Sequence, residues 1–215
     1  MYIPFQRCIQ EAGNKPFKGV IHIGAHRGQE AQDYANSGVR EVLWVEANKK
    51  MMKHLYDRTC NVPVKSHYFN ATLSDADGET VTLNVTNNEQ STSILELGTH
   101  ATMYPHITIS ERVTVQTKRF ESLWRENVGK IDLDHYDFVN IDVQGAELKV
   151  LRGFGEIWNR VPIRAVYAEV NFEHVYKGCC LVEELDEYLG SFGFKRHLTA
   201  APEGTWGDAL YLRQV

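Results

Sequence analysis

The sequence has few of the features that mark secreted scaffolds, membrane proteins or nucleic-acid binders. Only four of its 215 residues are cysteine and none form a Cys-x-x-Cys pair, so neither a disulfide framework nor a zinc or redox motif is expected. No run approaches the roughly 18 apolar residues that a transmembrane helix needs. Acidic residues outnumber basic ones, 28 to 23, which disfavours a surface built to neutralise phosphates. We therefore expect a protein that binds neither membranes nor nucleic acid.

Fibrous and disordered classes are excluded as well. With 16 glycines and 6 prolines, the chain is too poor in both for collagen or low-complexity disorder, and its 43% hydrophobic residues are typical of a globular protein. Residues 1–7 lack the charged and apolar regions of a signal peptide, which predicts a cytoplasmic protein. The length suits a single domain over residues 1–215, with residues 1–18 as an N-terminal lead-in.

Strand-like and helix-like segments alternate along the chain. The predicted strands are residues 19–23, 42–45, 64–73, 80–85, 112–117, 136–141 and 163–168, and the predicted helices are residues 29–36, 49–58, 120–127, 147–158 and 181–189. Residues 194–198 and 209–212 can pair as a C-terminal antiparallel hairpin. Such alternation predicts an α/β fold with a mostly parallel central sheet and helices on both faces, which binds ligands at the carboxyl ends of its strands.

One segment, residues 86–111, is polar, irregular and too long for a plain connector. It contains Ser91 and Ser93, and its position after a strand places it near the ligand-binding edge of the sheet. We interpret this segment as a substrate loop or lid, with the two serines as candidate contacts to the substrate.

The first two strand ends carry the residues expected of a nucleoside site. Gly24 and Gly28 follow the first strand, where glycine lets the backbone approach a ligand, and Glu46 ends the second strand, where its carboxylate can accept both ribose hydroxyls. The dinucleotide fingerprint G-x-G-x-x-G is not met because His26 holds its second glycine position, and no Walker motif is present. A ligand with a ribose but without a pyrophosphate, such as S-adenosylmethionine, fits this pattern better.

Several longer segments resemble one family. They are VIHIGAHRG at residues 20–28, VEAN at 45–48, NATLSD at 70–75 with DGE at 77–79, and VNIDVQGAE at 139–147 followed by VLRG at 150–153. This set is similar to the FkbM family of S-adenosylmethionine-dependent methyltransferases. The resemblance implies a Rossmann-like class I methyltransferase fold and methyl transfer to oxygen, often a hydroxyl of a sugar or another natural product.

The same resemblance implies roles for individual residues. By position, the methionine side of the cofactor would be lined by Gly24, Ala25, His26 and Gly28, the ribose by Glu46 with Ala47, the adenine by Asn70 and Ala71, and the transferred methyl by Asp142. Two positions depart from the pattern. His22 stands where such methyltransferases usually have an acidic residue, and Asn140 stands where this family often has lysine.

A hydroxyl that attacks a methyl group must lose its proton, so a carboxylate or histidine near the acceptor would serve as general base. Asp142 is the leading candidate because it ends the central strand, and Glu169 and His174 at the next strand end are rivals. A structural alternative for Asp142 is capping the helix that follows. Asp142, Glu147 and Glu169 could together attract magnesium, but separate strand-end carboxylates are common and we predict no metal.

Two other functions remain open at this point. Glu46 alone would permit an NAD-dependent oxidoreductase, and the same fold can serve as a non-catalytic binding module. The favoured prediction is an S-adenosylmethionine-dependent O-methyltransferase that acts on a small molecule or glycan. The oligomeric state does not follow from the sequence.

Overall fold

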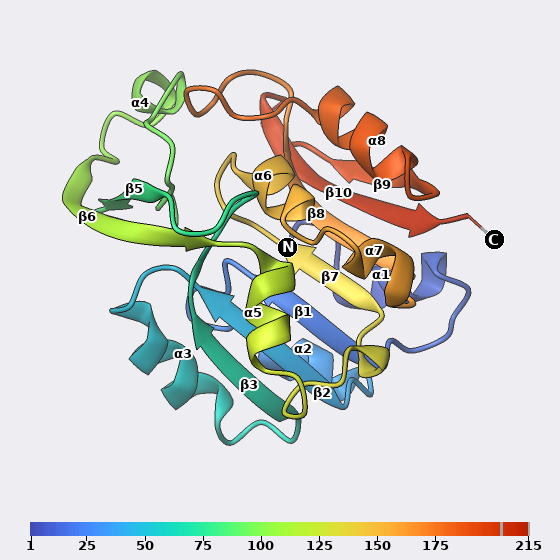
Figure 1. The fold of residues 1–215 in the computed structure, drawn as a ribbon. Coiled ribbons are helices and arrows are strands. Elements are labelled where there is room, and N and C mark those ends of the chain that lie inside the picture. The colour runs from blue at the N-terminus through green and yellow to red at the C-terminus, as the bar shows by residue number, and fades with distance from the viewer. Residues whose placement is uncertain (203, 215) are drawn as a thin grey trace.

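A seven-stranded sheet forms the centre of the computed structural model, which describes residues 1–202 and 204–214 (Figure 1). Its strand order is β3-β2-β1-β7-β8-β10-β9. The strands are β1 (Gly19–Ile23), β2 (Glu41–Glu46), β3 (Lys65–Asn70), β7 (Phe138–Ile141), β8 (Ala165–Asn171), β9 (Phe194–Ala200) and β10 (Trp206–Arg213). The first five in this order pair in parallel and β10 runs antiparallel to both neighbours. The predicted fold class, including the terminal hairpin, is confirmed.

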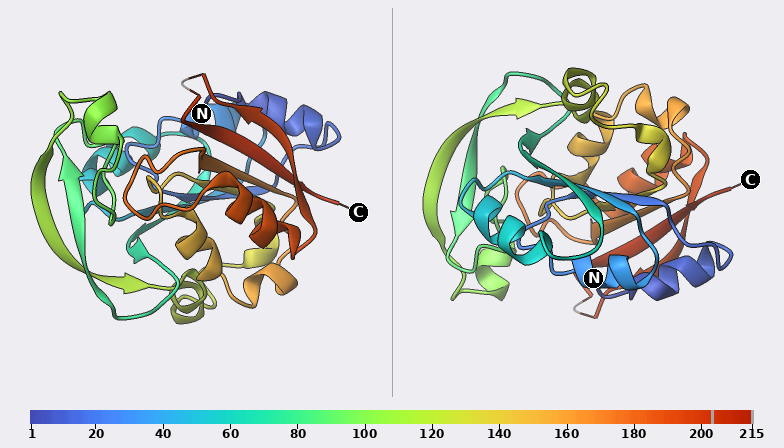
Figure 2. Two further views of the ribbon diagram at one scale, coloured as in Figure 1. Left: turned by 90° about the horizontal axis from the view of Figure 1, so that it is seen from above. Right: turned by 90° about the horizontal axis from the view of Figure 1, so that it is seen from below.

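Helices cover both faces of this sheet, as the two views of Figure 2 show. One face carries α1 (Phe5–Glu11), α2 (Ala31–Asn36) and α3 (Met51–Thr59), and the other carries α5 (Phe120–Glu126), α6 (Glu147–Arg152), α7 (Ile157–Arg160) and α8 (Val182–Gly190). Successive strand residues point to opposite faces, so Val42 packs in one core and Leu43 in the other. Because both faces are buried, the strands read as continuous apolar runs rather than as alternating ones.

A second, three-stranded sheet stands beside the first, with the order β4-β6-β5. It consists of β4 (Thr72–Leu73), β5 (Thr80–Thr86) and β6 (Ile109–Lys118). Residues 87–108, here called the arm, connect β5 to β6 and contain the short helix α4 (His100–Met103). The irregular part of the predicted 86–111 loop is therefore shorter than expected, and it lies toward the carboxyl ends of the central parallel strands (Figure 1).

Several predicted boundaries are wrong for identifiable reasons. The expected strand over 64–73 is divided, because β3 pairs with β2 whereas β4 turns away to pair with β6. The expected helix over 147–158 breaks between α6 and α7, where Gly155 adopts a left-handed φ of 52°. Strand β8 continues to Asn171, so Glu169 lies within the strand rather than after it. The N-terminal lead-in contains α1, whose Phe5 and Ile9 join the core.

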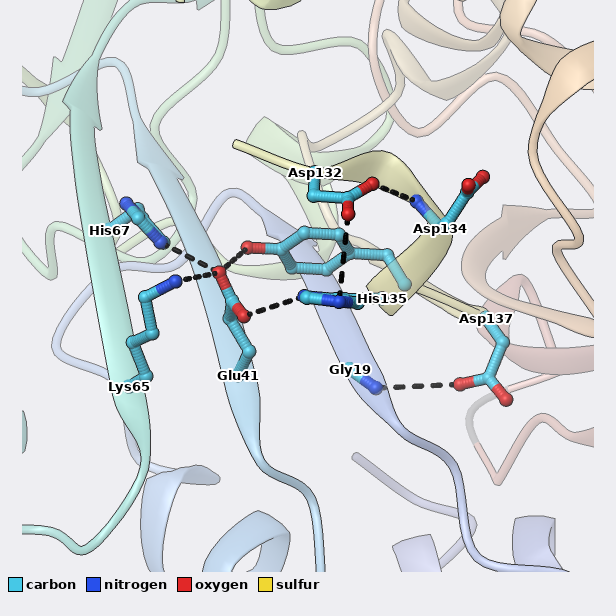
Figure 3. A network of polar contacts seen from close by, with 9 residues as sticks. Gly19, Glu41, Lys65, His67, Asp132, Asp134, His135 and Asp137 are labelled. Atoms are coloured by element: carbon cyan, nitrogen blue, oxygen red, sulfur yellow. Dashed lines mark hydrogen bonds and ion pairs between the residues drawn. The ribbon is translucent and has the colours of Figure 1, made fainter. Parts of the chain in front are cut away.

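A polar network fastens the sheet at its amino-terminal edge, opposite the arm (Figure 3). The buried Glu41, at the start of β2, lies 3.0 Å from Lys65 Nζ, 2.8 Å from His67 Nε2, 3.1 Å from the Tyr136 hydroxyl and 3.3 Å from His135 Nδ1. Burial acts to raise the pKa of Glu41, but these hydrogen bonds outweigh it and lower the pKa. One carboxylate thus ties β2 to β3 and to the segment before β7.

None of the helices within the described residues has the length and apolar character that a membrane span requires.

Candidate active site

A cavity of about 590 Å³ opens at the carboxyl ends of β1, β2, β7 and β8, beneath the arm. Most of the predicted site residues contribute to its wall: Gly24, Ala25, His26, Glu46, Ala47, Ala71, Ser91, Ser93, Asp142 and Glu169. Parallel strands bring these sequence-distant residues to a single edge of the sheet. The arm closes the cavity from the opposite side with residues that include His100 and Tyr104.

Three predicted residues lie outside this wall, and two of them support it indirectly. Gly28 has a φ of 66°, and a β-carbon there would lie 2.6 Å from Thr59 Cγ2, so its small size serves packing against α3. Asn70 donates its side-chain amide to the carbonyl oxygens of Glu46 (2.8 Å) and Ala47 (3.0 Å) and so fixes the turn after β2. His174 is exposed, and the structure does not bring it into the cavity.

The turn after β1 places backbone close to the end of β7. Gly24 has a φ of 78°, and a β-carbon built on it would lie 1.7 Å from the Asp142 carbonyl oxygen. The amides of Gly24 and Ala25 both donate to the Val45 carbonyl, at 3.0 and 3.1 Å. Only glycine allows this approach, which leaves backbone rather than side chain facing the ligand.

Glu46 lies in the wall, only 8% exposed, and is held in place by backbone donors. Its Oε2 accepts from the His26 amide and its Oε1 from the Asn48 amide, each at 2.7 Å. Burial raises the pKa of Glu46, and these two hydrogen bonds oppose the rise. Each oxygen retains a lone pair, so the carboxylate can still accept the two hydroxyls of a ribose.

His26 presents an unpartnered donor at the same place. Its Nδ1 lies 2.9 Å from Gln29 Nε2, and since an amide nitrogen can only donate, the proton of the neutral ring is assigned to Nε2. Burial lowers the pKa of His26, which favours the neutral ring. Nε2 is buried and has no partner among the described residues. A buried N–H group without an acceptor suits a ligand carboxylate, such as the one in the methionine part of S-adenosylmethionine.

Three carboxylates meet at the floor of the cavity. One oxygen each of Asp142, Glu147 and Glu169 lies within 4.8 Å of the others. Asp142 is open to the cavity, whereas Glu147 is fully buried and Glu169 is 4% exposed. Burial is the main cause that raises the pKa of Asp142 to about 6 and the pKa of Glu147 to about 7. The pKa of Glu169 is raised well above its usual value by burial first and then by the negative charges of Asp142 and Glu147. Such a cluster retains protons near neutral pH.

Glu147 and Asp142 differ in their hydrogen bonds to the turn after β7. Glu147 Oε1 accepts from the amides of Val143 (2.9 Å) and Gly145 (3.1 Å), which fixes the turn from inside the protein. Asp142 makes no capping hydrogen bond to α6, whose N-cap residue is Ala146 and has no side-chain cap. The capping alternative for Asp142 is therefore wrong, and its carboxylate remains available to the cavity.

Gln144, which the sequence does not single out, lies between the other members. Its Nε2 donates to Asp142 Oδ1 and to Glu169 Oε2, both at 2.6 Å, and its Oε1 accepts from the Tyr176 hydroxyl. The Gln144 amide is therefore a hydrogen-bond donor to both Asp142 and Glu169. The only available signal was its place inside the IDVQGAE segment, which by itself says nothing about side-chain direction.

The two departures from the family pattern form one neutral cluster. Asn140 Nδ2 donates to the Tyr34 hydroxyl at 2.7 Å, and that hydroxyl lies 3.2 Å from His22 Nδ1. Burial lowers the pKa of His22 to about 4, so the ring is uncharged at neutral pH. His22 and Asn140 both reach the cavity wall. This chain therefore has neutral groups at both positions where a charged pair was expected.

The arm is attached to the cavity floor through its serines. Ser93 Oγ donates to the backbone oxygen of Gln144 at 2.7 Å, and Ser91 Oγ lies 3.2 Å from His100 Nε2. Both serines are buried, at 2% and 7% exposure, rather than solvated as in an ordinary loop. An ion pair of 2.5 Å between Arg27 and Glu89 joins the arm to the turn after β1.

The comparison with known families decides to which family this chain belongs. The sequence profile described as the methyltransferase FkbM domain matches residues 22–196, a span that includes the turn after β1, the arm and the three carboxylates. The chain belongs to the FkbM methyltransferase family. It is a methyltransferase with S-adenosylmethionine as cofactor, and the oxidoreductase and scaffold alternatives fall away. No curated protein matches the chain.

Solved structures support the fold of this FkbM protein. It is similar to a SAM-dependent methyltransferase from Aquifex aeolicus, with 11% identity, a TM-score of 0.50, and coverage of 99% of this chain and 92% of the other. A ribosomal-protein methylase from Lactobacillus delbrueckii subsp. bulgaricus has 13% identity and a TM-score of 0.52, with coverage of 97% and 75%. Magnesium protoporphyrin IX methyltransferase from Synechocystis PCC 6803, with bound SAM, has 12% identity and a TM-score of 0.50, with coverage of 96% and 74%.

Proposed function

We propose that this FkbM protein transfers a methyl group to a hydroxyl of an uncharged small molecule or glycan, such as a sugar. The observation that carries the proposal is the position and state of Asp142. Its carboxylate is open to the cavity beside the Gly24 turn, and burial, opposed by the hydrogen bond from Gln144, raises its pKa toward neutrality. A base with such a pKa is well matched to removing a hydroxyl proton near pH 7.

The charge of the cavity supports an acceptor without phosphate. Its wall contains five carboxylates and, among the lining residues that the structure describes, no lysine or arginine: Glu30, Glu46, Asp142, Glu169 and Asp208 are the acids. A phosphorylated acceptor would be repelled by these carboxylates, which the Met1 ammonium, 3.9 Å from Glu30 in the same wall, offsets only in part, whereas a neutral sugar would not be repelled. This argues against a nucleic acid as acceptor more directly than the net charge of the chain does.

Aromatic groups in the wall suit a sugar ring. Trp206 Nε1 donates to the Tyr104 hydroxyl at 3.2 Å, which joins β10 to the arm across the cavity, and both residues line it. An apolar ring face combined with placed polar groups is the usual composition of a site for a small polar molecule. Ser91 and Ser93 supply hydroxyls on the same side and remain candidate contacts to the acceptor.

The cofactor, when bound, supplies the methyl group on a positively charged sulfonium. In this proposal Glu46 accepts the ribose hydroxyls, His26 Nε2 donates to the carboxylate of the methionine part, and the Gly24–Ala25 backbone permits close approach. Ala47 and Ala71 line the adenine side, whereas Gly28 and Asn70 act by holding neighbouring segments in place. The donors and acceptors described above provide this set of contacts.

The remaining step is proton removal from the acceptor. The Asp142 carboxylate takes the hydroxyl proton as the acceptor oxygen attacks, and the positioning of both groups in one cavity supplies further acceleration. Glu169 is a weaker candidate because burial and the neighbouring acids raise its pKa well above the usual value, which favours the protonated form. His174 is the weakest, since it lies outside the wall.

Two measurements test the proposal. Calorimetric titration with S-adenosylhomocysteine, with NAD as control, should give one-to-one binding of the first compound alone. The protein is then incubated with methyl-labelled S-adenosylmethionine and matched sugars, some neutral and some phosphorylated. Label in the neutral sugars supports the proposal, and label confined to phosphorylated sugars or to RNA contradicts it.

A further inference from the structure

We propose that Gln144 is a positioning residue for methyl transfer, whose side-chain amide holds the Asp142 and Glu169 carboxyl groups in place at the cavity floor through one hydrogen bond to each. This inference rests on the proposed function, in which Asp142 is the base. Gln144 is uncharged and is not among the residues that the sequence predicts for the site. In this proposal its side chain controls the charge of the cavity floor.

The side-chain geometry gives Gln144 both hydrogen bonds at once. Its Nε2 carries two protons, and one can go to Asp142 Oδ1 and the other to Glu169 Oε2, each over 2.6 Å. The Tyr176 hydroxyl donates to the Gln144 Oε1 and fixes which end of the amide faces the acids. The opposite orientation would place Oε1 against two carboxyl groups and lose both bonds.

The backbone of Gln144 is held in a conformation that disfavours any residue except glycine. Its φ is 57°, in the left-handed region. A turn that required only this backbone would be better served by glycine, as at the neighbouring Gly145 with a φ of 95°. The strained conformation is instead held from both sides, by Glu147 Oε1 on the adjoining amides and by Ser93 Oγ on the Gln144 carbonyl. Retention of a glutamine here is consistent with a role for its side chain.

The electrostatic surroundings show what this side chain opposes. Two side chains lower the pKa of Asp142 through hydrogen bonds, Gln144 first and Glu169 second, whereas the charges of Asp208 and Glu30 raise it. Without the Gln144 donor, Asp142 would keep only the hydrogen bond with Glu169, an acid whose own pKa is raised by the same contact, and would hold its proton to higher pH. The Gln144 amide lowers the pKa of Asp142 against the rise caused by burial.

The test uses the difference in charge between the cofactor S-adenosylmethionine and its product S-adenosylhomocysteine. S-adenosylmethionine carries a sulfonium charge that S-adenosylhomocysteine lacks, so an ionised Asp142 beside it should favour the former. Calorimetry gives the ratio of the two dissociation constants from pH 5.5 to 8.5, and groups common to both ligands cancel in that ratio. In the native chain the preference for the sulfonium should fall as the pH drops through about 6.

Gln144→Met keeps the length of the side chain but removes both donors. It should move the midpoint of this fall upward by about one pH unit, equivalent to roughly a tenfold change in the Asp142 proton affinity. Gln144→Glu retains the shape of the side chain and adds an acid, so it should also move the midpoint upward. This variant replaces Gln144→Met in the test if the methionine variant does not fold. Gln116→Met makes the same chemical change on exposed β6, where Nε2 donates only to Thr80, and should leave the curve in place.

The outcomes are distinguishable. A midpoint that is the same in the native chain and in both Gln144 variants overturns the role of Gln144 while leaving Asp142 as base. A ratio that does not change with pH in the native chain overturns the placement of Asp142 beside the sulfonium, and with it the proposed function and this inference.

Discussion

Gly24 and Asp142 meet so closely that a β-carbon on the first would stand 1.7 Å from the carbonyl oxygen of the second. The contact joins the carboxyl ends of β1 and β7, the two neighbouring strands that carry the cofactor turn and the carboxylate floor. The relative position of these two parts of the cavity therefore depends on the absence of one methyl group.

Gly24→Ala should destabilise the protein and abolish cofactor binding together. The left-handed φ and the overlap with backbone should cost about 2–5 kcal/mol in free energy of unfolding. Gly38→Ala is the matched control, because Gly38 has a φ of 83° but no atom within 4 Å of the added carbon. It should cost only about 1–2 kcal/mol and leave S-adenosylhomocysteine affinity intact. Urea unfolding and calorimetry measure both quantities, and equal losses in the two variants would contradict the close-contact argument.

Glu46→Gln should weaken S-adenosylhomocysteine binding by about 10- to 100-fold, because hydrogen bonds from the ribose hydroxyls to a charged acceptor are replaced by weaker ones to an amide. Glu111→Gln makes the same change at a partly exposed glutamate of β6, which pairs with Lys50 outside the cavity, and should have no effect on the dissociation constant. Unchanged affinity in Glu46→Gln, with the fold verified by circular dichroism, would remove Glu46 from the cofactor site.

Asp142→Asn should lower the rate of methyl transfer by about two to four orders of magnitude, because the amide cannot take the hydroxyl proton. In the native chain the rate should rise with pH through about 6, since the unprotonated carboxylate is the active form. This rise should be missing in the variant. Asp33→Asn, on exposed α2, is the control. A normal rate of methyl transfer in Asp142→Asn would show that another residue is the general base.

Glu41→Gln should reduce stability at neutral pH but not in acid. The pKa of Glu41 is lower in the folded protein than its ordinary value, so its contribution is fully present above about pH 4.5 and is lost as the pH falls through the folded-state value. The expected loss near pH 7 is about 1–3 kcal/mol. Urea unfolding at a series of pH values from 7 down to 3 should show a difference between variant and native chain that is largest near pH 7 and shrinks as the pH falls below about 4.5. An equal difference at every pH would show that Glu41 contributes through packing rather than charge.

The sequence alone was sufficient to predict the central sheet, and most of the site residues that it singled out lie in the cavity wall. Buried parallel strands require continuous apolar segments, and their carboxyl ends necessarily meet, so Gly24, Glu46 and Asp142 could be brought together before any coordinates existed. Glu41 and its four donors, by contrast, lie at strand starts and carry no recognisable motif.

The wrong predictions concern positions where tertiary contacts decide the direction of a side chain or of the backbone. Position near a strand end does not say which way a side chain turns, so His174 was grouped with Glu169 although only Glu169 reaches the cavity. The left-handed conformation of Gln144 follows from hydrogen bonds to its turn and not from local propensity, so its contact with two acids was not foreseeable. The break between α6 and α7 falls at Gly155, whose left-handed φ of 52° accompanies a close approach to α5: a β-carbon there would lie 2.3 Å from Glu121 Oε2.

The separation of the two sheets has an evolutionary consequence. Strand β6 pairs with β5 on one side and with β4 on the other, and neither β5 nor β6 pairs with the central sheet. The arm between β5 and β6 can therefore change length or composition without shifting the register of the strands of the central sheet. Donor recognition and acceptor recognition can therefore diverge independently. Transplanting residues 87–108 from one relative to another is, on this view, the most direct route to a methyltransferase with a new acceptor and an unaltered methyl donor.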